Sequence, residues 1–327
     1  MRATISTVFL VIGLLLYYLL SPTGKPFDRD AIRDSIAKLR SDLEVEKAKC
    51  HKAIHDYKPL NPKPISSKEF DLLSVLRGLP LRLSIEPLYE PDKAEGYIIH
   101  IRDWHLVNRD LFNADQQSRH DKSLNQADLD LLFEKHMLQV ALAQEGQIAC
   151  LKCLSAYHGL TDVFSEGFAS SEVNAFEATI NALKAIETQE MPEVFARLKE
   201  IRELENGLAG EELGKAKTIE ASLQDLIDKH RLKLLEIGAV GRLLISGDLR
   251  KVLPLEGEGG LTLGEPDKVS LKLAPKKVKE RQDLQVRELM KSHQSVIFLI
   301  LGGEHDLSQS IKKLLPTRGY IRVQTGF

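Results

Sequence analysis

The pattern of hydrophobic and polar positions begins with a long apolar run. Residues 3–20 (ATISTVFLVIGLLLYYLL) contain no charged side chain, and a membrane-spanning helix needs about 20 apolar residues, within a range of about 17–25. No small-residue cleavage site of the A-x-A type follows the run, as a signal peptide would require. The pattern predicts an uncleaved transmembrane anchor over residues 1–25, with a cleaved signal as the alternative. A short amino-terminal tail is easily kept in the cytoplasm, so we expect a single-pass membrane protein whose bulk is extracytoplasmic.

Helical spacing follows the predicted anchor. Four apolar positions between residues 27 and 57 recur at intervals of four, three and four residues, which places them on one helix face: Ile32, Ile36, Leu39 and Leu43. Prolines at positions 59, 62 and 64 then interrupt the pattern, as in a semi-rigid linker. Residues 26–65 are therefore predicted to form a juxtamembrane helix and a proline-rich linker, followed by a globular domain over residues 66–327.

Short apolar runs alternate with amphipathic segments in this predicted domain. Runs typical of strands occupy residues 96–101, 160–164, 252–255, 295–301 and 320–323, and helical spacing occupies residues 125–157, 237–245, 276–292 and 311–315. The run SVIFLIL at 295–301 lacks polar alternation, as in a strand buried on both faces, whereas Pro254 favours an edge strand. The order predicts an α/β fold with a largely parallel central sheet flanked by helices. Residues 171–234 are charged and helical throughout, which predicts a helical insertion.

Composition excludes several classes of protein. The 327 residues include 45 Lys and Arg against 47 Asp and Glu, so the chain lacks the basic charge of a nucleic-acid-binding domain. Aromatic residues make up 6% of the chain, which leaves little surface for stacking single-stranded bases. Three cysteines are too few for a disulfide scaffold. Cys150 and Cys153 lie inside a predicted helix rather than at its start, so we interpret this C-x-x-C pair as core residues.

Four side chains that could carry chemistry come directly after predicted strands: His105, Glu166, Glu256 and His305. Because open α/β sheets bind ligands outside the carboxyl ends of their strands, we expect these side chains to converge on one edge of the sheet. Gly302 and Gly303 would let the backbone approach a ligand closely.

Two histidines and a carboxylate form a set that can bind a metal. Imidazole and carboxylate ligands suit Zn, Mn or Fe, and three protein ligands leave a position for water, whose pKa the metal lowers. The predicted ligands are His105, Glu166 and His305, with Glu166 alternatively the general base and Glu256 a supporting carboxylate. Without a metal, the same groups could act as a His/Glu acid–base pair. Exposed loops are rich in such residues in any case, so the spacing alone leaves these interpretations open.

The segment GGEH at 302–305, after an apolar strand and before a predicted helix, resembles the second GxxH motif of a hydrolase-like superfamily. That superfamily includes the TraB and Tiki-type proteins, the erythromycin esterases and the haem-binding ChaN proteins. The segment FSEG at 164–167 resembles its glutamate motif, and Gly238-Ala239 before VLPLE at 252–256 resembles its helix-then-acid segment. IHIRDWH at 99–105 occupies the place of the first GxxH motif, with Arg102 where the family has glycine and only His105 retained.

The resemblance covers roughly residues 96–327 and implies a metal- or histidine-assisted hydrolase acting on a peptide or ester bond of a small-molecule or peptide substrate. Together with the predicted anchor, it makes a membrane-anchored hydrolase the leading expectation. Glu304 and Asp306 would then orient His305. Because one fold hosts several functions, a non-enzymatic binder of haem or another ligand, and an inactive scaffold that binds partners, stay as alternatives. We interpret the charged run at 276–287 as a solvated helix face and His100 as a packed core residue.

Overall fold

The computed structural model describes residues 27–104, 106–120, 123–257, 275–302 and 305–326 of the chain. The described residues divide into two compact units, one within residues 1–41 and 107–138 and the other within residues 42–106 and 139–327. Among the helices in the described ranges, none is long and apolar enough to cross a membrane. The predicted anchor at residues 1–25 lies outside those ranges.

The first unit is helical in its described part. It contains the beginning of α2 (Arg29–Asp56), all of α4 (Arg109–Arg119) and the beginning of α5 (Gln126–His158). Arg29 Nε lies 2.5 Å from Asp128 Oδ1, and Phe112 packs edge-on against Phe133 with ring centroids 5.4 Å apart. These contacts join segments that are far apart in the sequence.

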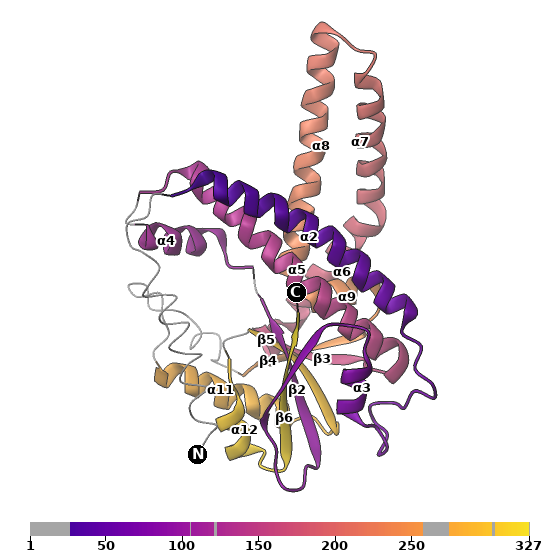
Figure 1. Cartoon of the computed structure of the whole chain (residues 1–327), viewed down its shortest axis with the longest axis vertical. Coiled ribbons are helices and arrows are strands. Elements are labelled where there is room, and N and C mark those ends of the chain that lie inside the picture. The colour runs from indigo at the N-terminus through magenta and orange to yellow at the C-terminus, as the bar shows by residue number, and fades with distance from the viewer. Residues whose placement is uncertain (1–26, 105, 121–122, 258–274, 303–304, 327) are drawn as a thin grey trace. The chain divides into compact units, whose positions relative to one another are not determined.

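The second unit is built around a six-stranded sheet with the order β1-β6-β2-β5-β3-β4 (Figure 1). The strands are β1 (Leu83–Tyr89), β2 (Gly96–Asp103), β3 (Asp162–Ala169), β4 (Lys251–Glu256), β5 (Val296–Gly302) and β6 (Arg318–Thr325). Only the β1–β6 pair in this sheet is antiparallel. The predicted α/β fold with a largely parallel sheet is therefore confirmed. Pro254 lies in β4 at one edge of the sheet, as its missing N–H favours.

Helices cover both faces of this sheet. All seven residues of β5 are buried, and successive side chains point to opposite faces. On one face, Phe298 and Ile300 pack in a core with α3 (Leu72–Gly78), α5 and α9 (Gly238–Ser246). On the other, Ile297 and Leu299 pack with α11 (Pro275–Met290) and α12 (Ser308–Leu314). The absence of polar alternation in this run follows from its double burial.

Two helices and one strand in the described ranges were not predicted. They are α3, α4 and β1. Strand β1 pairs with β6 at the edge of the sheet, and its register shifts between Pro87 and Tyr89. Alternation of half-buried and exposed residues extends only from Leu83 to Glu86, which leaves a short signal.

The chain between β3 and β4 is almost entirely helical. It comprises a 3₁₀ turn (Ser170–Glu172), α6 (Val173–Ala185), a π-helical turn (Ile186–Glu190), α7 (Met191–Glu205), α8 (Gly210–Glu236) and α9. Helices α7 and α8 form an antiparallel hairpin (Figure 1) whose seam contains Met191, Leu198 and Ile227. Gly210 adopts φ +58° at the turn, a conformation that glycine allows without steric cost. The hairpin lies within the predicted insertion at 171–234 apart from the last two residues of α8.

The three cysteines are buried and unpaired with one another. Cys150 and Cys153 belong to the core between α5 and the sheet. Burial raises the pKa of the Cys150 thiol to about 12 and that of Cys153 to about 11. The interpretation of the C-x-x-C pair as core residues is confirmed, because reactive cysteines need a lowered pKa and access to solvent.

Candidate functional site

Two of the predicted glutamates come together with His305 at the carboxyl edge of the sheet. Glu166 belongs to β3, Glu256 is the last residue of β4, and His305 follows β5. Since these strands are parallel, their carboxyl ends lie at the same edge. These three residues therefore lie at one edge of the sheet, as predicted. The fourth predicted residue, His105, lies outside the described ranges.

Glu166 lies inside β3, so the prediction that it follows the strand was wrong. The strand continues to Ala169, and its pairing with β4 is irregular between Ser165 and Ala169. Gly167 adopts φ +96° within this irregular part, a region that residues with a Cβ rarely enter. The Glu166 side chain is 6% exposed, and its Oε1 accepts a hydrogen bond of 2.6 Å from the backbone N–H of Gly302.

Arg281 of α11 joins the two carboxylates. Its Nη2 lies 3.4 Å from Glu166 Oε2, while Nε and Nη2 together donate to both carboxylate oxygens of Glu256. Gln285 Nε2 donates a further hydrogen bond of 3.1 Å to Glu256 Oε1. Burial lowers the pKa of Arg281, but the hydrogen bond to Glu256 and the two negative charges together raise it above its ordinary value. The guanidinium is therefore a fixed cation between two acids.

The interpretation of residues 276–287 as a solvated helix face was wrong at Arg281. The Arg281 side chain is 12% exposed and Glu256 is fully buried. A sequence signal exists: Val278, Arg281, Gln285 and Leu289 follow one another at three, four and four residues, so they lie on one helix face. Arg281 and Gln285 are thus on the same face as Leu289, which packs in the core on the sheet.

His305 stands beside Glu166. Its Nε2 lies 3.6 Å from Glu166 Oε2, and its side chain is 19% exposed. The backbone N–H of His305 donates to Gly302 O at 3.0 Å, which ties His305 to the end of β5. An imidazole partly open to solvent beside a buried carboxylate can accept a proton and be stabilised in its charged form.

The other predicted site residues have different positions. Gly302 is the last residue of β5, and its N–H holds Glu166. Asp306 is exposed, and its Oδ1 accepts a hydrogen bond from the backbone N–H of Ser308 at the start of α12. Gly303 and Glu304 lie outside the described ranges.

A cavity of about 510 Å³ opens over Glu166, Arg281 and His305. Its wall also includes side chains from β2, α5 and the base of the helical insertion. The described lining residues outside the cluster are Asp103, Leu106, Gln144, Ser165, Gly167, Phe168, Phe176, Leu235, Glu236, Ile237, Gly238 and Val240. The His/Glu/Arg cluster thus faces a space of the size that small ligands occupy.

The described residues of the cluster do not by themselves fit a divalent metal. A guanidinium already contacts both carboxylates, so a second cation there would meet its positive charge. Within the described ranges, no group of three His, Cys, Asp or Glu side chains has metal-binding geometry. The predicted ligand His105 lies outside those ranges, and the metal stays a prediction.

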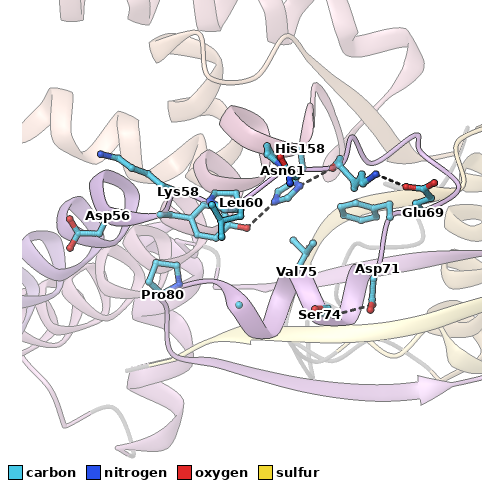
Figure 2. Close-up of a pocket in the computed structure, with 16 residues that line it drawn as sticks. Asp56, Lys58, Leu60, Asn61, Glu69, Asp71, Ser74, Val75, Pro80 and His158 are labelled. Carbon is cyan, nitrogen blue, oxygen red and sulfur yellow. Dashed lines mark hydrogen bonds and ion pairs between the residues drawn. The ribbon is translucent and has the colours of Figure 1, made fainter.

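A second cavity, of about 470 Å³, lies between the proline-rich linker and α3 (Figure 2). His158 on its wall is 2% exposed. Its Nδ1 donates to Lys63 O at 2.9 Å, and its Nε2 accepts from the Tyr57 hydroxyl at 2.8 Å. Both ring nitrogens of His158 are therefore engaged in holding the linker on α5, and this histidine is not a candidate base.

Fold and site together define an α/β protein with a His/Glu/Arg cluster at the carboxyl edge of its sheet. Comparison of the chain with protein-family models, with curated proteins and with solved structures gave no match.

Proposed function

We propose that the chain is a membrane-anchored hydrolase that uses a histidine–glutamate pair to cleave an ester or peptide bond. The observation that carries this proposal is His305 Nε2 at 3.6 Å from Glu166 Oε2 on the wall of a cavity of about 510 Å³. The order of a glutamate motif at 164–167 and a GxxH motif at 302–305 supports membership of the TraB, Tiki, erythromycin-esterase and ChaN superfamily.

In the proposed reaction His305 acts as general base. Its imidazole takes a proton from a water molecule whose oxygen attacks the carbonyl carbon of the substrate, and later returns that proton to the leaving group. Glu166 stabilises the imidazolium that forms, because an adjacent negative charge favours the charged form of the ring. Arg281 and the Gly302 N–H keep the Glu166 carboxylate in place.

Replacing His305 by glutamine tests the proposal. The full chain in detergent is assayed against chromogenic esters and fluorogenic peptide amides, and we expect His305→Gln to lower the hydrolysis rate by about a hundredfold or more. His293→Gln is the matched control, because His293 is exposed in the turn before β5, and it should leave the rate unchanged. A chelator should also leave the rate unchanged.

Three results would overturn the proposal. Equal rates in His305→Gln and the unmodified chain would place the chemistry elsewhere. Loss of activity with a chelator, and its return with Zn, Mn or Fe, would restore the metal-dependent alternative. A Soret band on titration with haem that is lost in His305→Gln, without any hydrolysis, would favour the ligand-binding alternative.

The anchor is the second part of the proposal, and residues 3–20 support it by length and lack of charge. We expect the full chain to stay in the membrane fraction after an alkaline carbonate wash, and a chain without residues 1–25 to move to the soluble fraction. Recovery of the full chain in the soluble fraction would contradict the anchor. A protease added to intact cells should degrade the bulk of the chain if it faces outward.

A further inference from the structure

The cavity beside the His/Glu/Arg cluster has apolar lining residues as well as charged ones. Phe168 of β3 stacks on Phe176 of α6, with ring centroids 4.5 Å apart and an interplanar angle of 4°. Ile237, between α8 and α9, and Val240 of α9 also line the cavity. All four residues pack in hydrophobic cores of the protein as well, and that packing is reason enough for them to be apolar.

Two leucines that line the same cavity differ from these four residues. Leu106 follows β2, and Leu235 lies near the end of α8. Both are half-buried and line the cavity. Among the described residues, neither leucine belongs to a hydrophobic core cluster or packs against one. Two segments far apart in the sequence therefore each contribute to the cavity an apolar side chain that core packing does not account for.

The backbone that carries Leu235 is held in place. Gln144 Nε2 donates to Leu235 O at 3.0 Å, and the Ile237 N–H donates to Lys233 O at 3.1 Å. The first bond joins the end of α8 to α5, and the second continues the helical hydrogen bonding past that end. Since the leucine is presented by an ordered backbone, a ligand that packs on it loses little affinity to ordering of the protein.

We propose that this cavity selects a substrate with an uncharged apolar group beside the bond to be cleaved, and that Leu106 and Leu235 bind this group. The inference rests on the proposed function, because His305 on the wall of the same cavity would act on that bond. Small-molecule sites combine a mostly apolar lining with a few placed polar groups that fix the orientation of the ligand. The His/Glu/Arg cluster supplies the polar groups, and the two leucines with Phe176 and Ile237 supply the apolar contact.

Matched neutral ligands test the inference by binding alone. The dissociation constants of 3-phenylpropionamide and propionamide, which differ only in the phenyl group, are measured by calorimetry on the full chain in detergent. We expect 3-phenylpropionamide to bind about tenfold more tightly, because its ring leaves water on binding. Added sodium chloride should not lower this preference, because screening weakens attraction between charges and not apolar contact.

Variants locate the preference in the cavity. Leu106→Asn and Leu235→Asn should each lower it about threefold, because asparagine has nearly the size of leucine and lacks its apolar surface. Neither leucine packs in a core cluster, so both variants should fold, which circular dichroism checks. Leu226→Asn, at a 50% exposed position of α8, is the matched control and should keep the preference. Binding of the ring to detergent micelles is equal for all of these proteins and cancels in the comparison.

Equal affinity for the two amides would overturn the inference. So would a preference that Leu106→Asn and Leu235→Asn both keep, or one that salt abolishes. His305→Gln should retain the preference, because both leucines are unchanged. An apolar preference without His305-dependent hydrolysis would refute the proposed function alone, and His305-dependent hydrolysis without the preference would refute this inference alone.

Discussion

Replacing Arg281 by methionine is expected to lower the free energy of unfolding by about 3–5 kcal/mol. Methionine keeps most of the length of the side chain but removes the donors that hold both oxygens of Glu256. The Glu256 side chain is fully buried, with 0% of it exposed to water. Breaking a buried pair by removing one partner leaves an uncompensated charge, and this is what makes the loss large. Denaturant unfolding of both proteins measures it.

Two further variants separate this cause from a general effect of substitution. Arg281→Met combined with Glu256→Gln should recover about 2 kcal/mol, because the buried charge is then gone. Arg287→Met, at an exposed position on the same helix, should cost less than about 0.5 kcal/mol. If Arg281→Met costs no more than Arg287→Met, the guanidinium does not hold the buried acid, and the description of the cluster is wrong.

The fold could be predicted where burial leaves a strong pattern along the chain. Strand β5 is apolar at almost every position because both of its faces are covered. Strand β1 is different: it lies at the edge, contains Pro87 and shifts register there. Its alternation is interrupted after Glu86, so the signal that marks a half-buried strand is too short to detect.

The site could be predicted only in part, for a related reason. Glu166 and His305 stand near the ends of predicted strands, and the topology of a parallel sheet brings such positions to one edge. Arg281 comes from a helix between two strands, in a segment where charged residues surround it. Charge alone does not distinguish an arginine that faces solvent from one that faces Glu256. Only the spacing of Val278, Gln285 and Leu289 indicates which face of the helix is buried. Using that spacing to assign Arg281 to the site requires knowing that α11 packs on the sheet.

A buried chain of hydrogen bonds lies directly beneath the segment that carries His305. The backbone N–H of Leu307 donates to the Tyr320 hydroxyl at 3.4 Å, and that hydroxyl lies 2.8 Å from His100 Nδ1. His100 Nε2 lies 2.9 Å from Leu301 O. Since Leu301 O can only accept, Nε2 carries the proton, Nδ1 accepts from Tyr320, and His100 is neutral. The chain of bonds joins the end of β5 to the start of α12, with His305 between them.

Acidification should therefore destabilise the protein through His100. Burial lowers the pKa of His100 to about 4, although the hydrogen bond to Leu301 O raises it. In the unfolded chain the ordinary value of about 6.5 applies. Between these values the unfolded chain binds a proton that the folded chain does not, so the free energy of unfolding falls as the pH falls through this window. From pH 7.5 to pH 5.0 the contribution of His100 is about 2 kcal/mol, measured by denaturant unfolding at both pH values.

Matched variants assign this pH dependence to one ring. His100→Gln can still donate to Leu301 O but cannot take up a proton, so its stability should change by about 2 kcal/mol less between the two pH values than that of the unmodified chain. His51→Gln, at an exposed position on α2, should keep the full pH dependence. Other titrating groups contribute equally to all three proteins and cancel in the comparison. If the stability of His100→Gln keeps the full pH dependence, His100 takes up a proton in the folded chain as readily as in the unfolded chain. The hydrogen bond from Tyr320 to a neutral Nδ1 would then be wrong.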